Sequence, residues 1–470
     1  MDKLTKRAVV VLTAFIILFT GLIVYLSYFQ VFKSASLKNH PFNKRLWANE
    51  EKVKRGSISD RNGLVLAESQ KNEESNKRIY NYGALYSHVI GYSSREFGKS
   101  GLELRYNNEL LNINPSMAIN DLKNIVLPSS VGNNLELTID HSMQEKSRSL
   151  LSNYKGSVIT MNPKTGEIYS MVSLPDFDAA NLNEVWKDVI EDNNSPLLNR
   201  ATQGLYAPGS IFKVITTSAI LNSDEGLDLN YNCTGQELVD GYTFTDYGKM
   251  KHGNINLSKA FINSCNTYYA SKSQVIKYPS ILTMAEAYMF NQKIDFDLDV
   301  KTSQIPKNEL TGTSLSATAI GQGDIQTTPL NMLLTVSTIA NDGKMMKPYL
   351  VKSVQSDSGR IIRQTKPEEL SRPIDPFTSI EIANMMREVV KSGTGKNASI
   401  KNVKVAGKTG TAENGSGKTH SWFMGYAPFD DPKISVIVIL EESGLTGGKG
   451  AAPIARDLII HGLNNINFEE

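Results

Sequence analysis

One uninterrupted apolar run lies near the beginning of the chain. Residues 8–32 carry no charged side chain, and the seven residues before them include two lysines and one arginine. About 20 apolar residues, at about 1.5 Å each, cross the hydrocarbon layer of a bilayer, so this run predicts one transmembrane helix. The bulky residues at 25–32 do not suit the cleavage site of a secretory signal, which favours a retained anchor. Positive charge before the helix predicts a cytoplasmic tail at 1–7 and an extracytoplasmic location for everything after 32.

Residues 33–150 show weaker and shorter patterns. Their first part is polar and charged, and a short apolar run at 64–66 follows the turn signal Asn62-Gly63. The segment 135–139 alternates apolar and polar residues, as a strand with one buried face does. We interpret 33–150 as an irregular α+β pedestal between the membrane and a main domain at 151–470.

Strong strand signals lie at both ends of the main domain. The segments 157–161 and 167–173 flank a turn at 162–166, and a second hairpin joins 419–426 to 434–441. Helical patterns lie between the hairpins, at 210–221, 257–271, 329–340 and 378–390. Strands at both ends with helices between them predict one antiparallel sheet beside a helical cluster, so the predicted fold class is α+β.

Composition narrows the function without identifying it. The 470 residues carry 50 basic and 48 acidic side chains, and this near balance gives no reason to expect nucleic-acid binding. Cys233 and Cys265 are too few for a disulfide framework, and we expect free, buried thiols, with a single bridge between them left open. Neither the cysteines nor the six histidines have metal-ligand spacing, and no phosphate-binding loop or dinucleotide fingerprint occurs. We therefore expect neither a metal site nor a cofactor.

Two short motifs, Ser-x-x-Lys and Lys-Thr-Gly, each occur twice in the chain. The first copies lie close together beside the first predicted hairpin, at 152–155 and 164–166. The later copies begin at Ser210 and at Lys408, and Ser264-Cys265-Asn266 lies between them. These wide gaps allow a folded domain to bring distant elements together. We therefore take the later, ordered set as the candidate active site and the first copies as chance matches.

Ser210 and Lys213 follow the step Pro208-Gly209, which marks a helix start. Positions i and i+3 share one face of a helix, so the two side chains can touch. A serine hydroxyl is a poor nucleophile without a base, and Lys213 can be that base only if burial or a second cation lowers its pKa. Backbone N–H groups at a helix start can also hold an oxyanion. The pair predicts a serine nucleophile with its general base.

The motif Ser264-Cys265-Asn266 offers two further polar groups. Ser264 can relay a proton between Lys213 and a departing amine, and the Asn266 amide can bridge Lys213 and a substrate amide. Both residue types are common in loops, so the motif has meaning only together with the others.

The motif Lys408-Thr409-Gly410-Thr411 follows a predicted strand at 403–406 and precedes the terminal hairpin. We expect it to form an edge strand to which a substrate backbone adds, and Gly410 lets that backbone come close. Lys408 and the hydroxyls of Thr409 and Thr411 suit a substrate carboxylate, and the backbone N–H of Thr411 can complete an oxyanion hole.

Further segments fall in an order that resembles a known family. They are RGSISDRNG at 55–63, GKSGLE at 98–103, LNRA at 198–201, the Ser210 motif, Ser264-Cys265-Asn266, IGQG at 320–323 and KTGTAE at 408–413. Over nearly everything after residue 50, the chain resembles the class B penicillin-binding proteins, in particular the small members of the penicillin-binding-protein-A type. Ala207 and Asn162 depart from the usual pattern, outside the chemistry considered above.

The resemblance implies the penicillin-binding and serine β-lactamase-like transpeptidase fold and a peptidoglycan D,D-transpeptidase activity. Ser210 would be acylated by a stem peptide that ends in D-Ala-D-Ala, and an amine from a neighbouring stem would take the acyl group. β-Lactams would acylate the same serine. No glycosyltransferase domain fits before residue 150, so the resemblance also implies a polytopic glycan polymerase of the shape, elongation, division and sporulation (SEDS) class as a partner.

Other interpretations of the same residues stay open. An anchored D,D-carboxypeptidase or β-lactamase would use the same groups and resolve the ester with water, although the pedestal signatures argue against a hydrolase. A penicillin sensor or scaffold without catalysis is a third hypothesis, against which the complete set of motif residues speaks. The sequence leaves open the cellular role, the acceptor amine and the oligomeric state.

Overall fold

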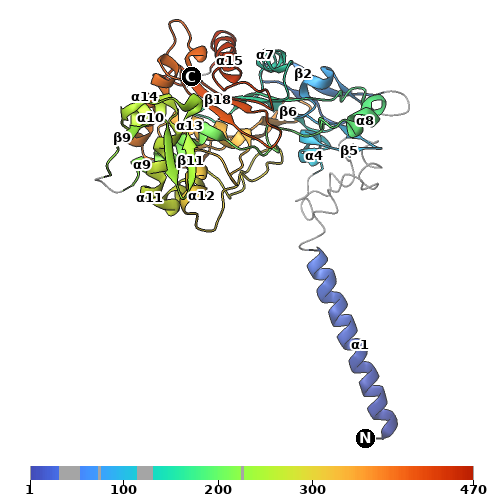
Figure 1. Ribbon diagram of the computed structural model, residues 1–470. Coiled ribbons are helices and arrows are strands. Elements are labelled where there is room, and N and C mark those ends of the chain that lie inside the picture. The colour runs from blue at the N-terminus through green and yellow to red at the C-terminus, as the bar shows by residue number, and fades with distance from the viewer. Residues whose placement is uncertain (1, 31–52, 72–75, 114–130, 224–226, 469–470) are drawn as a thin grey trace.

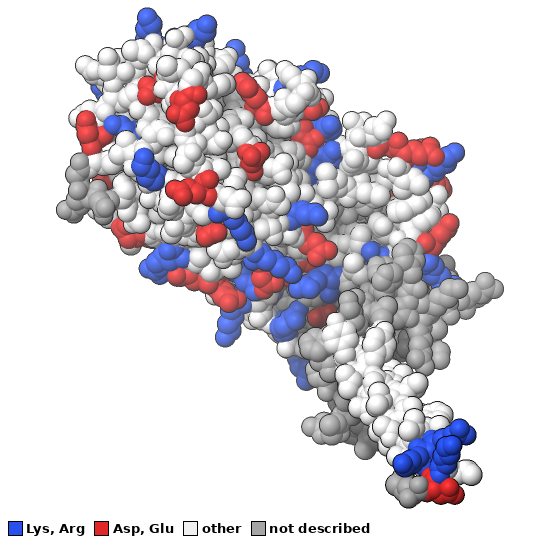
Figure 2. All heavy atoms as spheres, turned by 60° about the horizontal axis from the view of Figure 1, so that its bottom comes forward, with Lys and Arg blue, Asp and Glu red and all other residues white. Residues whose placement is uncertain are grey.

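The computed structural model of the chain describes residues 2–30, 53–71, 76–113, 131–223 and 227–468 (Figure 1). Within them one helix, α1 (Lys3–Tyr28), is long and apolar enough to cross a membrane, with a mean hydropathy of 2.8 over 18 residues and no buried part. Figure 2 shows an uncharged surface along this helix, with charged side chains gathered at its N-terminal end. The helix fits the predicted single-pass anchor; residues 31 and 32 of the predicted segment lie outside the described residues.

The main domain is built on a five-stranded antiparallel sheet with the order β17-β18-β19-β7-β8. Its strands are β7 (Gly156–Met161), β8 (Ile168–Leu174), β17 (Ala406–Ala412), β18 (His420–Ala427) and β19 (Ile434–Leu440). Both predicted hairpins are confirmed, and β19 joins them by pairing with β7. The strand predicted to begin at 403 begins instead at Ala406 and continues through the Lys408 motif as the edge strand.

Helices cover both faces of this sheet (Figure 1). Along β19, Val436 and Val438 pack into a core shared with α7 (His141–Leu151) and α15 (Ala451–Asn465). The intervening Ile437 and Ile439 pack into the other core, which includes α13 (Pro329–Ile339). Because successive side chains of a strand point to opposite faces, a sheet covered on both faces buries every position of its central strands and gives them an unbroken apolar sequence.

The second core holds the predicted helical cluster. Its helices are α9 (Lys213–Leu221), α10 (Leu257–Asn263), α11 (Asn266–Ala287), α12 (Gly312–Ala319), α13 and α14 (Pro376–Lys391). The predicted helices at 329–340 and 378–390 are confirmed. The single helix predicted at 257–271 is wrong, because the chain breaks at Ser264, whose φ of 57° is left-handed, and a new helix begins at Asn266.

The pedestal contains a six-stranded sheet with the order β15-β14-β6-β1-β2-β3. Its strands are β1 (Ile58–Ser59), β2 (Val65–Lys71), β3 (Asn76–Tyr80), β6 (Asn134–Leu137), β14 (Val351–Gln355) and β15 (Ile361–Gln364). The strands predicted at 64–66 and 135–139 correspond to β2 and β6. Two strands come from beyond residue 350, with Val354 opposite Leu135. The domain division at residue 150 stays a prediction, and β14 and β15 lie far beyond it in sequence.

Together with the short elements around the candidate site, which are given below, further elements complete the described chain. They are η2 (Gly83–Tyr86), β4 (Ser93–Ser94), β5 (Gly98–Lys99), α4 (Gly101–Arg105), α5 (Asn107–Leu110), α8 (Leu182–Glu191), β10 (Gln236–Val239), β11 (Tyr242–Thr245), β13 (Met345–Met346), β16 (Glu369–Ser371) and η5 (Lys396–Ala398).

A buried ion network joins the two pedestal signatures. The fully buried Glu103 carboxylate accepts from Arg55 Nε at 2.5 Å and from Arg78 Nε at 2.7 Å. Arg78 Nη1 also donates to the Gly56 carbonyl at 2.8 Å. Burial by itself would raise the pKa of Glu103, but the two guanidinium groups outweigh it and hold the pKa below its ordinary value. The network therefore fixes 98–103 against 55–63.

Replacing Glu103 with glutamine is expected to lower the free energy of unfolding by about 3 kcal/mol, because two buried guanidinium groups lose their counter-charge. Since the folded state lowers the pKa of Glu103, this stabilisation is present above the unfolded pKa and is lost as the pH falls through the folded one. Urea unfolding of the detergent-solubilised chain at neutral and acidic pH measures both effects. Glu96→Gln, at an exposed carboxylate of the same region, is the control, and equal midpoints for the two variants would contradict the prediction.

Candidate active site

Ser210 lies in η3 (Gly209–Phe212), a 3-10 turn that runs directly into α9. Gly209 has a left-handed φ of +55°, and a Cβ at this position would lie 2.6 Å from the Thr411 carbonyl oxygen of β17. Only glycine therefore allows the turn to adopt this conformation so close to the edge strand. On its other side, the Gly209 N–H donates to the Gly321 carbonyl at 2.9 Å. The turn is held between β17 and the 320–323 segment.

Lys213 is fully buried at the start of α9. Its Nζ donates to the Ser264 carbonyl at 2.8 Å, to Asn266 Oδ1 at 2.7 Å and to Ser264 Oγ at 3.4 Å. Burial lowers the pKa of Lys213 to about 8, and the nearby Cys265 and Asp246 oppose part of that shift. A lysine with this pKa is neutral often enough near neutral pH to accept a proton. Lys213 thus meets the condition that the sequence set for a general base.

Lys408 reaches the same serine from the edge strand. It is also fully buried, and its Nζ donates to Ser264 Oγ at 2.9 Å and to the Thr409 carbonyl at 3.2 Å. Burial, and then the positive charge of Lys213, lower the pKa of Lys408 well below its ordinary value. The Ser264 hydroxyl therefore lies between two buried lysine side chains. Each lysine also lies over an aromatic ring: Lys213 Nζ is 5.3 Å from the centre of the Tyr269 ring, and Lys408 Nζ is 5.6 Å from that of Phe261.

Asp246 holds the Ser264–Asn266 loop in place, and sequence reasoning missed it. It lies just before η4 (Tyr247–Lys249) and is 3 % exposed. Its Oδ1 accepts hydrogen bonds from the backbone N–H of Asn266 and, at 3.2 Å, from the backbone N–H of Thr267. These bonds satisfy two N–H groups at the start of α11. The Asn266 amide also donates to the Thr245 carbonyl at 3.0 Å, which leaves Oδ1 of Asn266 for Lys213. A single aspartate in a polar loop carries no motif, so no sequence signal could have found it.

The remaining motif residues lie along the edge strand. Among the described residues, β17 pairs only with β18, so its other edge is open to an added strand. Thr409 is buried and its hydroxyl bonds that of Thr394 at 2.6 Å, whereas Thr411 is half-buried and accepts from the Gly447 N–H at 3.2 Å. A Cβ at Gly410 would lie 3.1 Å from the Pro208 carbonyl oxygen. Glycine therefore lets the strand approach the Ser210 turn.

The structure brings four predicted residues into one hydrogen-bonded cluster: Lys213, Ser264, Asn266 and Lys408. Ser210 lies half-buried on the adjacent turn, and no partner of its hydroxyl is found among the residues that the structure describes. The first copies of the motifs do not join the cluster. Ser152 is exposed at the end of α7 and donates to the Ser149 carbonyl at 2.9 Å, and Lys164 pairs with Asp431 at 2.5 Å.

Residues outside the three catalytic motifs also support the chain that leads into the Ser210 turn. Trp422 Nε1 donates to the Ala207 carbonyl at 3.1 Å. The Glu441 carboxylate accepts from Arg200 Nε at 3.0 Å and from the Tyr206 hydroxyl. These contacts hold the chain on the N-terminal side of Ser210 against β18 and the end of β19.

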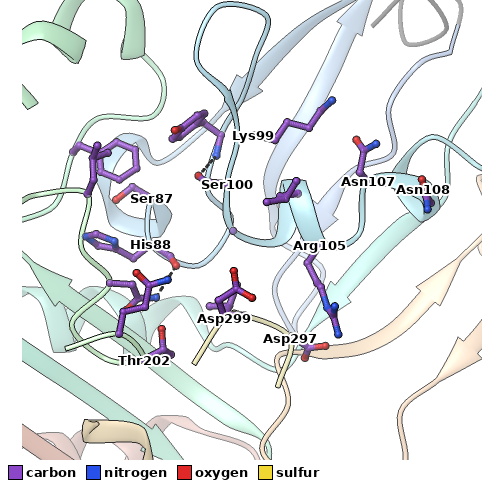
Figure 3. Close-up of a pocket in the computed structure, with 18 residues that line it drawn as sticks. Ser87, His88, Lys99, Ser100, Arg105, Asn107, Asn108, Thr202, Asp297 and Asp299 are labelled. Atoms are coloured by element: carbon purple, nitrogen blue, oxygen red, sulfur yellow. Dashed lines mark hydrogen bonds between the residues drawn. The ribbon is translucent and has the colours of Figure 1, made fainter. Parts of the chain in front are cut away.

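A cavity of about 670 Å³ lies apart from this cluster, between the pedestal and the main domain (Figure 3). Ser100, Arg105 and Asn107 line it from the pedestal, and Thr202 and Asp299 line it from the main domain. None of the candidate active-site residues lines this cavity. Volume alone therefore does not mark the catalytic centre of this fold.

Two family descriptions match the chain. Residues 156–460 match the penicillin binding protein transpeptidase domain, and residues 55–166 match the penicillin binding protein A dimerisation domain. The first match includes all the candidate active-site residues, from Ser210 to Thr411.

Similar proteins are found among curated sequences and solved structures. The chain is 30% identical to peptidoglycan D,D-transpeptidase PbpA of Mycolicibacterium smegmatis, over 98% of both chains. The D,D-transpeptidase domain of a peptidoglycan glycosyltransferase from Eggerthella lenta superimposes with a TM-score of 0.80 at 32% identity, covering 88% of this chain and 99% of that one. The penicillin G acyl-enzyme complex of penicillin-binding protein A from M. tuberculosis superimposes with a TM-score of 0.79 at 28% identity, covering 87% and 100%.

The pKa of Lys213 predicts how the reactivity of Ser210 changes with pH. Because the neutral amine is the base, the rate of acylation by penicillin G should rise about tenfold per pH unit below about pH 8 and level off above it. Stopped-flow measurement with full-length protein in detergent gives this profile. Lys164→Ala, which removes the chance Lys-Thr-Gly match at a residue that pairs with the exposed Asp431, should leave the profile unchanged. A rate independent of pH from about 6 to about 9 would contradict a lysine base.

Proposed function

Because the chain belongs to the penicillin-binding protein transpeptidase family, we propose that it is a peptidoglycan D,D-transpeptidase that acts through an acyl-enzyme on Ser210. One observation carries the proposal: three motifs far apart in sequence meet at a single hydroxyl. Ser264 Oγ lies 2.9 Å from Lys408 Nζ and 3.4 Å from Lys213 Nζ. A chance coincidence of short motifs would not place two fully buried lysines on the same serine.

In the first half-reaction, neutral Lys213 takes the proton of the Ser210 hydroxyl. The Ser210 oxygen then attacks the carbonyl carbon of the penultimate D-alanine, and the carbonyl oxygen becomes an oxyanion. The backbone N–H groups of Ser210 and Thr411 are the proposed donors to that oxyanion. The closeness of Gly209 to the Thr411 carbonyl supports this pairing, because it brings the turn and the strand together.

Collapse of the tetrahedral intermediate breaks the peptide bond and leaves an ester on Ser210. The departing nitrogen of the terminal D-alanine needs a proton, and Ser264 is placed to pass one on from Lys213. Lys408 donates to the same hydroxyl and so supports its role as a proton donor. Asn266, held by Asp246 and Thr245, keeps Lys213 directed at this point.

The edge strand is the proposed platform for the stem peptide. An extended peptide can add to the edge of β17 that has no strand partner among the described residues, through backbone hydrogen bonds. The half-buried Thr411 hydroxyl, with the positive charge of Lys408 behind it, suits the terminal carboxylate. Thr409 contributes in this proposal through its backbone, because its buried hydroxyl already bonds Thr394.

In the second half-reaction, an amine of a neighbouring stem peptide attacks the ester carbonyl. A new amide forms, Ser210 regains its proton, and two stems are cross-linked. A β-lactam enters the same first half-reaction, but its leaving amine stays attached to the acyl group, so the ester persists.

The apolar α1 supports attachment of the enzyme to the membrane by a single span. Basic residues at its start favour a cytoplasmic N-terminus, with the pedestal and main domain outside.

The described residues contain the transpeptidase site and no second enzymatic match, so a membrane-embedded glycan polymerase of the SEDS class is the proposed partner that supplies glycan strands.

Ser210→Ala is expected to abolish covalent labelling by a fluorescent penicillin while leaving the fold intact, because the nucleophile alone is removed. Labelling is read after denaturing electrophoresis, and thermal unfolding verifies the fold. Ser152→Ala is the matched control and should label like wild type. Full labelling of Ser210→Ala would place the nucleophile elsewhere and overturn the proposal.

The lifetime of the penicilloyl ester separates a transpeptidase from a hydrolase. We expect intact-mass spectrometry to find one adduct that persists for many minutes after free penicillin is removed, because the leaving amine of the β-lactam stays attached to the acyl group. Loss of the adduct within seconds would favour a β-lactamase. Release of D-alanine from a stem peptide without any cross-linked product in the presence of an acceptor amine would favour a carboxypeptidase.

A further inference from the structure

Four side chains with metal-binding atoms converge behind the Ser264–Asn266 loop. Cys233 ends β9 (Tyr231–Cys233), and His252 precedes β12 (Gly253–Ile255). Cys265 is the N-cap residue of α11, and Asp246 accepts from the first backbone N–H groups of that helix. One ligand atom from each lies within 4.8 Å of the other three. No role in the proposed acyl transfer requires two thiols and an imidazole at this place.

The distances within the cluster are close to those of a tetrahedral metal site. Bonds of about 2.3 Å to sulfur and about 2.0 Å to nitrogen or oxygen set ligand-to-ligand edges of about 3.3–3.8 Å. The two sulfur atoms are 3.7 Å apart, and the Cys233 sulfur lies 3.3 Å from His252 Nδ1. Asp246 Oδ2 lies 3.0 Å from the Cys233 sulfur, 3.4 Å from the Cys265 sulfur and 3.6 Å from His252 Nδ1.

Burial and charge also call for a cation here. Cys233, Asp246 and Cys265 are at most 3 % exposed, and His252 is half-buried at the rim. Among the described residues, no lysine or arginine pairs with the Asp246 carboxylate, and His252 is its sole ion-pair partner. The backbone N–H groups of Asn266 and Thr267 and the Thr267 hydroxyl, at 2.8 Å from Oδ2, already donate to this buried carboxylate, and a bound dication would add an ionic partner to these hydrogen bonds.

We propose that Cys233, Asp246, His252 and Cys265 bind one Zn²⁺ ion. Two thiolates, an imidazole and a carboxylate are ligands that zinc accepts in tetrahedral geometry, and four protein ligands leave no open position for catalysis. Both thiols lose their protons on binding, so the dication replaces two protons and the net charge of the cluster is unchanged. The site is structural.

The position of the ion would also affect the acyl transfer, an inference that rests on the proposed function. Asp246 would ligate zinc through Oδ2 while its Oδ1 holds the backbone N–H groups of Asn266 and Thr267. Cys265 lies between Ser264 and Asn266 in the chain. The ion would therefore fix the loop whose carbonyl and amide oxygens accept from Lys213, and its four ligands act as positioning residues for the acyl transfer.

Sequence spacing did not indicate this site, and the prediction that no metal would be bound differs from this proposal. The ligands are separated by 13, 6 and 13 positions rather than by the short intervals of familiar metal motifs. They meet because β9 and β12 pair with each other beside the start of α11. Both cysteines are free, in agreement with the expected buried thiols, so their sulfur atoms remain available as ligands.

The metal content of the full-length protein tests the site directly. Protein purified in detergent with a reductant and no chelator should contain about one zinc per chain by mass spectrometry of the metal. Replacement with Co²⁺ should give intense visible d–d bands and a near-ultraviolet thiolate-to-cobalt band, both typical of tetrahedral sulfur ligation. Background zinc after loading under reducing conditions, or weak octahedral cobalt bands, would overturn the proposal.

Variants locate the ion. His252→Ala and Cys265→Ala should each lower zinc affinity at least about tenfold, whereas Cys233→Asp, which keeps a ligand, should retain the ion. His461→Ala, at a half-buried histidine on α15 that bonds Ser142 at 2.7 Å, is the matched control. Zinc retained by His252→Ala and Cys265→Ala at wild-type affinity would place the metal elsewhere. If a variant fails to fold, zinc is instead removed from the wild-type protein with a chelator and its zinc affinity is measured on reloading.

Two readouts keep the metal site and the acyl transfer distinguishable. Ser210→Ala should hold zinc like wild type, since no ligand changes, and so reports on the site independently of the chemistry. Zinc-depleted wild type should react with penicillin G about tenfold more slowly and recover when zinc is returned. If wild type as purified contains one zinc per chain but reacts with penicillin G at an unchanged rate after the zinc is removed, the metal site is confirmed and its positioning role is refuted.

Discussion

The site depends on the burial of two lysines around one serine hydroxyl. In a medium of low polarity, neighbouring ammonium groups cannot both keep their ordinary pKa, so the fold itself makes one of them available as a base. Lys213 and Lys408 are both inaccessible to solvent, and Ser264 accepts from each. Every other feature of the main domain contributes to this arrangement: the start of α9, the break between α10 and α11, and the edge strand β17 bring the three residues together.

The sheet explains how such an arrangement stays fixed. Its central strands are buried on both faces, and β17 is tied to β18 along its whole length. A strand held on one side by β18 keeps its side chains in fixed positions beside the Ser210 turn. Gly209 and Gly410 then determine how closely the nucleophile turn can approach that strand.

Features encoded over short stretches of sequence could be predicted, and features made by distant contacts could not. The two hairpins, the Ser210 turn and the edge strand follow from local periodicity and from motif order. The helix break at Ser264 could not be predicted, because a carboxylate from Asp246 caps the new helix. The convergence of Cys233, Asp246, His252 and Cys265 was missed for the same reason, since the pairing of β9 with β12 brings them together. The membership of β14 and β15 in the pedestal sheet depends on pairing with β6 across more than 200 positions.

That last pairing determines the order in which the protein can be completed. β6 has β1 on one side, and its other side is occupied only once residues 351–355 exist. The pedestal therefore cannot finish folding as an independent first unit while the chain is being synthesised, although it comes first in sequence. Its sheet keeps an unpaired edge until most of the main domain has been made, and β17, β18 and β19 follow later still. The two domains mature together, so damage to the strand pair β14–β15 would show itself in the pedestal rather than in the segment where the mutation lies.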